Sequence, residues 1–410
     1  MLNKNGEREL AYVVHIDNII PIEGADRVEQ AIVGGWHIMV RKGQFQIGDL
    51  AIYFEIDSKV PEKPEFEFLA AKHYKVKTQK YFKGTVISQG LLMSAEDFGW
   101  ENTTGGQFAD DAPIIKRPDG SYLIEGDFLT KELGVTYAEA EDNKRKANSA
   151  DKYKKMAQRR PNIFKKKWAQ WMMRRNWGKK VMFFFFGKKK DKKGSWPSWV
   201  KKTDEERIQN MTWILEDKTP WYATEKIDGT STTFTMKGFG RKREFYICSR
   251  NVVFDKPDKV CFYDTNVYLE MAAKYNIEKV LADLLNTFKD VFEYVTIQGE
   301  TYGAGIQKRD YGIDYHDFMA FNLIVGYKDG RVKRYNPKEM TIMLSKYNIP
   351  CVPIVSQEFI LPDSVEELLD IATDKSAIDG GMREGLVFRS ADGVQSFKAV
   401  SNEFLLKYHN

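Results

Sequence analysis

The chain has 410 residues, 42% of them hydrophobic, and a formal net charge of +5, which is enough for two domains and a sizeable core in at least one. No apolar run approaches the roughly 20 residues of a membrane helix and no signal peptide is evident, so we expect neither a membrane span nor secretion. Three scattered cysteines and five histidines without metal-ligand spacing argue against a disulfide framework or a zinc site, and they favour a reducing, intracellular compartment.

Residues 1–135 are predicted to form a compact β-rich domain. Short runs rich in Val, Ile, Phe and Trp, separated by glycine-containing turns, are typical of a small barrel. A five-stranded OB-type barrel that binds nucleic acid fits this length. The strand candidates are 11–16, 28–33, 36–40 and 49–56.

A basic run with interleaved aromatic residues follows these strands. Its members are Lys72, Tyr74, Lys75, Lys77, Lys80, Tyr81, Phe82 and Lys83. Cations suit phosphates and rings suit bases, so this composition favours single-stranded nucleic acid, with Lys75, Lys77 and Lys80 as the binding residues. The alternative is a solvated lysine-rich loop whose rings belong to the core.

Residues 136–200 form a basic linker or insertion, called here the basic segment. Phe164, Trp168 and Trp171 have helical spacing among lysines and arginines, and the apolar run 181–186 is flanked by lysines. We expect this run to pack as a strand or against a neighbouring domain. A polyanion-binding clamp of salt-dependent affinity is the favoured interpretation, and a solvated spacer is the alternative.

Residues 201–410 show a mixed α+β pattern. A helical stretch over 267–292 lies among strand candidates. Antiparallel sheets with helices on their outer faces would enclose a cleft, with Lys226 at its floor. The strand candidates are 244–249, 295–299, 319–325, 352–355, 385–390 and 394–400.

Lys226 stands two residues before Asp228 and three before Gly229. We interpret it as a covalent nucleophile, which requires that burial or a neighbouring cation favour the neutral amine. Asp228 would share the strand face of Lys226, and Gly229 would let the backbone pass close to a phosphate. A surface lysine before an Asp-Gly turn is the alternative.

A second set of candidates follows Lys226 in a fixed order. Arg250 offers a guanidinium fork for phosphate, Glu300 and Glu384 supply carboxylates at strand ends, and Phe321 supplies a ring for stacking. Lys398 places another cation on the last strand. Each residue alone has an ordinary structural explanation, but their order together indicates a common site.

This order resembles the covalent nucleotidyltransferase superfamily of polynucleotide ligases and mRNA capping enzymes. The resemblance covers residues 201–398, and the segment 204–210 is similar to the one that precedes the nucleophile in RNA ligases. Only twelve residues follow Lys398, too few for the trailing OB module of DNA ligases and capping enzymes. The segments 21–26, 48–58 and 88–91 instead look like the leading OB domain of the Deinococcus and Naegleria type of RNA ligase.

The resemblance implies an ATP-dependent RNA ligase that acts through lysyl-AMP on Lys226 and an RNA-adenylate, at nicks in duplexes, as a monomer. Its implied cofactors are ATP and Mg²⁺ or Mn²⁺, the metal being held through water by Asp228, Glu300 and Glu384. A larger nucleotide-binding set is implied, with Arg207 on the β- or γ-phosphate and Arg250 on the RNA end. Its members are Glu225, Lys226, Gly229, Glu300, Phe321, Glu384 and Lys398.

One position departs from the family pattern. Many RNA ligases have a second lysine two residues after the one at Lys398, and here that residue is Val400. Either Lys398 acts without a second lysine, or Lys407 or a residue of the basic segment takes the place of that lysine. The alternative functions are a capping-type guanylyltransferase and a non-catalytic RNA-end-binding protein.

Overall fold

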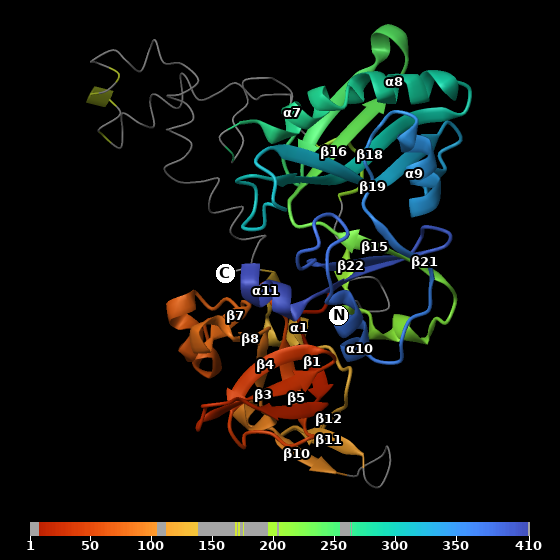
Figure 1. Cartoon of the computed structure of the whole chain (residues 1–410). Helices are drawn as coiled ribbons and strands as arrows, with labels where there is room; N and C mark the ends of the chain where they lie inside the picture. Colours follow the sequence, from red (N-terminus) through yellow and green to blue (C-terminus); the bar gives the residue numbers. More distant parts are fainter. Residues whose placement is uncertain are drawn as a thin grey trace.

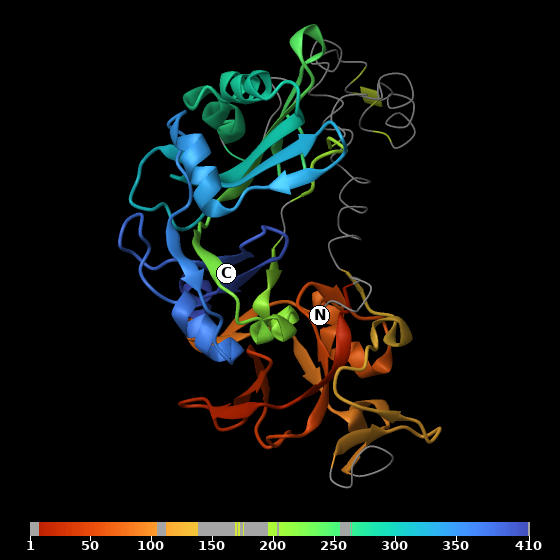
Figure 2. The same cartoon turned by 90° about the vertical axis from the view of Figure 1, so that its right-hand side faces the viewer.

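The computed structural model describes residues 8–104, 112–137, 196–202, 205–254 and 265–408, with the single positions 169, 171, 172, 175 and 263. The described chain has an N-terminal β-rich part at one end and a two-sheet part at the other (Figures 1 and 2). The helix and strand expected in the basic segment lie almost wholly outside the described residues. No helix in the described part of the chain is long and apolar enough to cross a membrane.

The N-terminal part is built on two three-stranded sheets. One has the order β1-β5-β9, from β1 (Ala11–His15), β5 (Leu50–Phe54) and β9 (Leu91–Met93). The other has the order β2-β3-β4, from β2 (Asn18–Pro21), β3 (Val28–Val33) and β4 (Trp36–Arg41). The four predicted strands are therefore present.

Smaller elements complete this part. Its other strands are β6 (Ser58–Lys59), β7 (Gln79–Tyr81), β8 (Val86–Ser88), β10 (Glu101–Thr104), β11 (Pro113–Lys116), β12 (Tyr122–Leu123) and β13 (Thr136–Tyr137). Its helical turns are η1 (Pro64–Lys72), η2 (Phe82–Gly84), η3 (Ala95–Phe98) and α1 (Thr130–Leu133). Apolar residues on both faces of β1 and β5 are buried, because separate hydrophobic clusters pack against each face.

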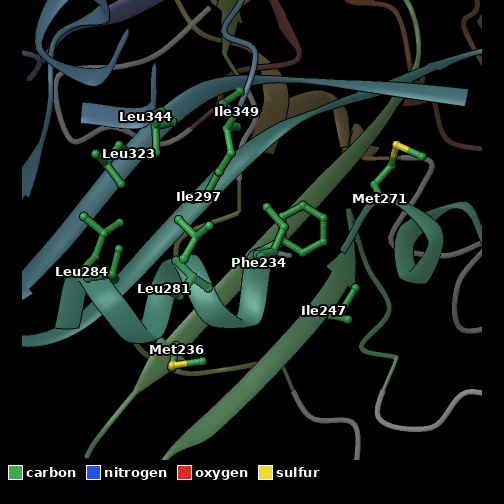
Figure 3. Close-up of a cluster of buried hydrophobic side chains, with 14 of the residues drawn as sticks. Phe234, Met236, Ile247, Met271, Leu281, Leu284, Ile297, Leu323, Leu344 and Ile349 are labelled. Atoms are coloured by element: carbon green, nitrogen blue, oxygen red, sulfur yellow. The ribbon is translucent and has the colours of Figure 1, made fainter. Parts of the chain in front are cut away.

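The larger sheet of the second part has the order β17-β16-β18-β19-β20. Its strands are β16 (Thr230–Lys237), β17 (Glu244–Ser249), β18 (Phe292–Gly303), β19 (His316–Tyr327) and β20 (Val332–Arg334). Helices α7 (Val267–Lys274), α8 (Ile277–Thr287) and α9 (Pro337–Ser345) pack against it through one buried cluster. Leu281 and Leu284 of α8 belong to this cluster with Met236 and Ile297 of the sheet (Figure 3).

The predicted helical stretch 267–292 is therefore two helices. The chain turns at Asn276, whose φ of 49° is left-handed and cannot continue a right-handed helix. Strand β18 also extends beyond the predicted 295–299 on both sides, so Glu300 lies within the strand rather than at its end.

The smaller sheet has the order β14-β23-β22-β15-β21. Its strands are β14 (Glu206–Arg207), β15 (Trp221–Lys226), β21 (Ile354–Phe359), β22 (Gly385–Ser390) and β23 (Ser396–Val400). Helix α10 (Val365–Ala372) and the turns η4 (Ile208–Asn210) and η5 (Thr212–Glu216) cover one face. All pairings in this sheet are antiparallel except β14 with β23, which is parallel. The turn η6 (Gly240–Lys242) precedes β17, and helix α11 (Asn402–Tyr408) follows β23.

The N-terminal part meets the smaller sheet along a seam. Gly35, in the tight turn between β3 and β4, lies so close to α10 that a Cβ there would stand 3.1 Å from Val365 Cβ. Lys80 Nζ donates to the Leu406 carbonyl of α11 at 2.6 Å. Ile87 shares a small buried cluster with residues of β23 and α11. Backbone proximity, one charged hydrogen bond and apolar burial thus join the two parts.

Candidate active site

A pocket of about 170 Å³ opens between the two sheets of the second part. Strands β15, β22 and β23 form one wall, and β16, β18 and β19 form the other. Six of the residues predicted from sequence line it together. They are Glu225, Lys226, Arg250, Glu300, Phe321 and Lys398.

Lys226 is the last residue of β15, and its amine faces the start of β22. Its Nζ lies 2.6 Å from Glu384 Oε2, with 24% of the lysine side chain and 8% of the glutamate side chain exposed. Burial lowers the pKa of Lys226, but the carboxylates of Glu384, Glu300 and Asp228 outweigh it, so the pKa is raised above its ordinary value. The structure corrects the expectation that these surroundings favour the neutral amine.

Glu300 is the acidic residue most affected by the pocket. Burial and the neighbouring carboxylates of Glu384 and Asp228 raise its pKa to about 8, and Lys226 and Arg250 only partly oppose them. Three carboxyl groups therefore crowd around one ammonium. Within the described ranges, no group of three or more His, Cys, Asp and Glu side chains stands close enough to hold a metal ion directly.

Asp228 and Gly229 lie just beyond the end of β15. The Asp228 backbone N–H donates to Tyr311 Oη at 2.7 Å, which fixes the turn that follows Lys226. A Cβ at Gly229 would stand 2.9 Å from Glu300 Cγ and closer still to the Thr301 carbonyl oxygen. Close packing of the turn against β18 therefore requires glycine at position 229, independently of any approach of the backbone to a phosphate.

Glu225 lies on the opposite face of β15 from Lys226, because alternate strand residues point to opposite faces. It is buried, and its carboxylate accepts hydrogen bonds from Ser376 Oγ and from the Ala377 backbone N–H, the latter at 2.8 Å. These bonds anchor the segment that leads to Glu384. Although Glu225 contributes to the pocket wall, its carboxylate is engaged on the other face.

Phe321, Lys398 and Arg250 complete the pocket. Phe321 of β19 is half-buried and packs against a cluster that includes Ile227 and Val352. Lys398 lies on β23 opposite Val387 of β22, so it shares the sheet face of Lys226. Arg250, directly after β17, is exposed at the rim.

Residues 219–409 match the family model described as RNA ligase, and residues 10–95 match an OB-fold domain model. The two-sheet part of the chain therefore belongs to the RNA ligase family. The enzyme is a covalent nucleotidyltransferase, and the α+β class with a leading OB fold expected from the sequence is confirmed. No curated protein matches the chain.

Solved structures show how far this fold is shared. A mutant of the Naegleria gruberi RNA ligase with ATP and Mn is 24% identical, with a TM-score of 0.63 over 98% of this chain and 100% of the other. The Naegleria gruberi RNA ligase with PPi is also 24% identical, with a TM-score of 0.62 over 98% and 99% of the two chains. Another mutant, with AMP and Mn, has 24% identity and a TM-score of 0.63 over 98% and 99%.

Arg207 of the ligase lies outside the pocket lining. Its guanidinium lies 5.7 Å from the centre of the Trp36 ring, at the seam with the OB domain. Burial lowers its pKa despite the Glu384 carboxylate, and its Nη1 is buried without a hydrogen-bond partner among the described residues. In the register of β14 and β23, Arg207 is opposite Lys398.

The three lysines predicted to bind RNA do not line the pocket. Lys80 is bound to the Leu406 carbonyl, and burial together with the nearby Lys308 lowers its pKa. Lys75 is half-buried, whereas Lys77 is exposed. Lys80 thus has a structural role at the seam that its place in a basic run did not indicate.

Sequence reasoning missed two charged residues of the pocket. Glu205 and Arg389 line it, and Arg389 is almost completely buried. Burial lowers the pKa of Arg389 to about 10 although Glu205 opposes this, so the guanidinium remains cationic at neutral pH. An arginine directly after the apolar run 386–388 of the predicted strand 385–390 was the available signal.

Proposed function

We propose that the ligase joins an RNA 3′-hydroxyl to an RNA 5′-phosphate with ATP, through lysyl-AMP and RNA-adenylate intermediates. The observation that carries this proposal is the Lys226 amine, which is paired with Glu384 and lies in a pocket that Glu300, Phe321 and Lys398 also line. Lys226 Nζ bonds to the α-phosphorus of ATP and pyrophosphate leaves. An RNA 5′-phosphate oxygen then displaces the lysine from AMP, and a 3′-hydroxyl displaces AMP to form the phosphodiester.

Lys226 must lose its proton before it attacks, and the neighbouring carboxylates hold that proton on the amine. An oxygen donor set with excess negative charge fits hydrated Mg²⁺ or Mn²⁺. Asp228, Glu300 and Glu384 would hold such an ion through water. When bound, the ion supplies positive charge that stabilises the neutral amine and the charge that develops on the phosphate.

The remaining pocket residues position the nucleotide and the RNA end. Phosphoryl transfer depends mainly on in-line positioning and on neutralised charge. Lys398 meets the α-phosphate, Phe321 stacks on adenine and Arg250 binds the RNA 5′-phosphate at the rim. Arg207 meets the β- or γ-phosphate, for which its guanidinium must turn from Trp36 toward the pocket.

We assign nicked duplexes with an RNA 3′-hydroxyl strand as the substrate. Support comes from the leading OB domain, which provides a second surface for nucleic acid beside the pocket. We also propose that the ligase acts as a monomer, because all proposed site residues belong to one chain.

The test is covalent labelling with α-labelled ATP and Mg²⁺ or Mn²⁺, followed by sealing of a nicked duplex. Wild type should form an acid-labile adduct and seal the nick, whereas Lys226→Ala should do neither. Lys346→Ala, at an exposed lysine outside the pocket, is the matched control and should behave as wild type. An undiminished adduct in Lys226→Ala, or an adduct with GTP alone, would refute the proposal.

A further inference from the structure

The pocket has a defined direction along the smaller sheet. Lys226, Gly385 and Val400 are opposite one another at one end. The pocket lining extends from Lys226 toward Arg389 and Glu205, whereas Val400 packs in the buried cluster at the OB seam. Four residues back along β15, Tyr222 is opposite Arg389, which corresponds to about 13 Å at the usual strand rise.

Glu205 lies at this far end of the pocket. It directly precedes β14, and its Oε2 accepts a hydrogen bond from Ser396 Oγ. Its Oε1 lies 3.4 Å from Arg334 Nη1 and 3.6 Å from Arg389 Nη2. Arg389 Nη1 in turn donates to the Phe321 carbonyl, so the carboxylate is fixed beside the residue proposed to stack on the base.

A nucleotide bonded to Lys226 through its phosphate would extend along the residues that line the pocket, away from the buried Val400. Its middle lies beside Thr224, Val387 and Lys398, which are opposite one another across three strands, and its base lies toward Glu205. A carboxylate has about four lone-pair sites. The contacts at Glu205 leave acceptor capacity for a ligand and supply no donor on the carboxylate itself.

We infer that Glu205 is the residue that selects adenine over purines with a 6-oxo group, which rests on the proposed function. The 6-amino group of adenine donates to the carboxylate. A 6-oxo group would instead place an acceptor against a fixed negative charge. The two guanidinium groups and Ser396 act as positioning groups, because they hold the carboxylate against rotation.

The experiment measures kcat/KM for adduct formation with ATP, inosine triphosphate and purine riboside triphosphate. Inosine triphosphate has the 6-oxo group without the 2-amino group of guanine, and purine riboside triphosphate has no 6-substituent. The kcat/KM of wild type should be lower with purine riboside triphosphate than with ATP by about tenfold or more, as expected for a lost hydrogen bond to a charged group. It should be lower still with inosine triphosphate. This measurement needs no variant and so does not depend on a mutant's folding.

Glu205→Gln should lower the ratio of kcat/KM with ATP to kcat/KM with inosine triphosphate by about tenfold or more, because an amide can turn its N–H toward a 6-oxo group. The matched control is Glu206→Gln, one residue along, whose carboxylate accepts from Asn210 Nδ2 outside the pocket. It should keep the wild-type ratio.

The outcomes distinguish a failure of this inference from a failure of the proposed function on which it rests. A parallel loss with both nucleotides in Glu205→Gln would indicate a purely structural role and overturn the inference, as would equal wild-type use of ATP and purine riboside triphosphate. No adduct with any nucleotide in wild type would overturn the proposed function and the inference with it.

Discussion

Gly229→Ala is the substitution that most directly tests how the turn after Lys226 is built. The added Cβ would stand 2.9 Å from Glu300 Cγ and 3.1 Å from the Thr301 carbonyl carbon. Ordinary contacts of this kind begin near 3.4 Å. The obstacle is the backbone of β18, which cannot move without disturbing its pairing with β16 and β19. The turn itself must therefore shift away from β18.

The magnitude follows from that overlap. Overpacking by one carbon in a tightly packed site costs about 1–3 kcal/mol of stability. A displacement on the order of 1 Å at the end of β15 would also move Lys226 relative to its substrate, and such misplacement costs roughly a hundredfold in rate. We expect adduct formation to fall by about that factor while the protein remains folded.

The assay combines single-turnover labelling by α-labelled ATP with thermal unfolding. Gly305→Ala is the control: this glycine follows β18, has a φ of 71° and would place its Cβ in open space. It should lose only about 1–2 kcal/mol from the left-handed backbone and keep its labelling rate. A labelling rate in Gly229→Ala within threefold of wild type would refute the packing argument.

Three further predictions concern charged groups. Burial raises the pKa of Glu300 from 4.5 to about 8, so the unfolded chain loses this proton at lower pH than the folded chain, and stability falls as pH rises between these values. In the absence of nucleotide, Glu300→Gln should therefore raise the free energy of unfolding in urea by on the order of 2 kcal/mol near pH 8 and by nothing near pH 4. An equal gain at both pH values would contradict this prediction. Lys80→Met should lose about 1 kcal/mol of stability in thermal unfolding, because the bond to the Leu406 carbonyl is removed. Lys77→Met, at an exposed lysine, should keep its stability and bind RNA more weakly at a given salt concentration. The reverse pattern would indicate that Lys80 binds RNA. Glu225→Gln should slow labelling by ATP and lower the free energy of unfolding by about 1–3 kcal/mol, because an amide cannot accept both hydrogen bonds of the buried carboxylate. An unchanged free energy of unfolding would contradict this role of Glu225.

Local patterns were sufficient for much of the fold. Short runs rich in β-branched and aromatic residues predicted β3, β17 and β22 at their observed bounds, because such residues favour strands. The single helical stretch was wrong at Asn276, where a left-handed residue divides α7 from α8. An asparagine within an otherwise helical pattern does not by itself indicate such a break.

The candidate site was predictable where a residue's type carries the chemistry. The order of Lys226, Arg250, Glu300, Phe321 and Lys398 identified one pocket because the motifs lie on, or directly after, the strands that line it. The second face of a strand was harder to assign. The Glu225 carboxylate belongs to that face, where its partners Ser376 and Ala377 are some 150 residues away in the chain and no spacing rule connects them.

The sequence by itself determined the family and the order of the OB fold and the ligase part, and it predicted Lys226 as the nucleophile, since these depend on residue types at fixed local spacing. Only the tertiary structure decided that the pKa of Lys226 is raised, because the carboxylates of Glu384 and Glu300, distant in sequence, join that of the neighbouring Asp228 around its amine. It also gave Lys80 its place at the seam and buried Val400 there. Electrostatic fields and packing act through space, so they exist only once the chain has brought these residues together.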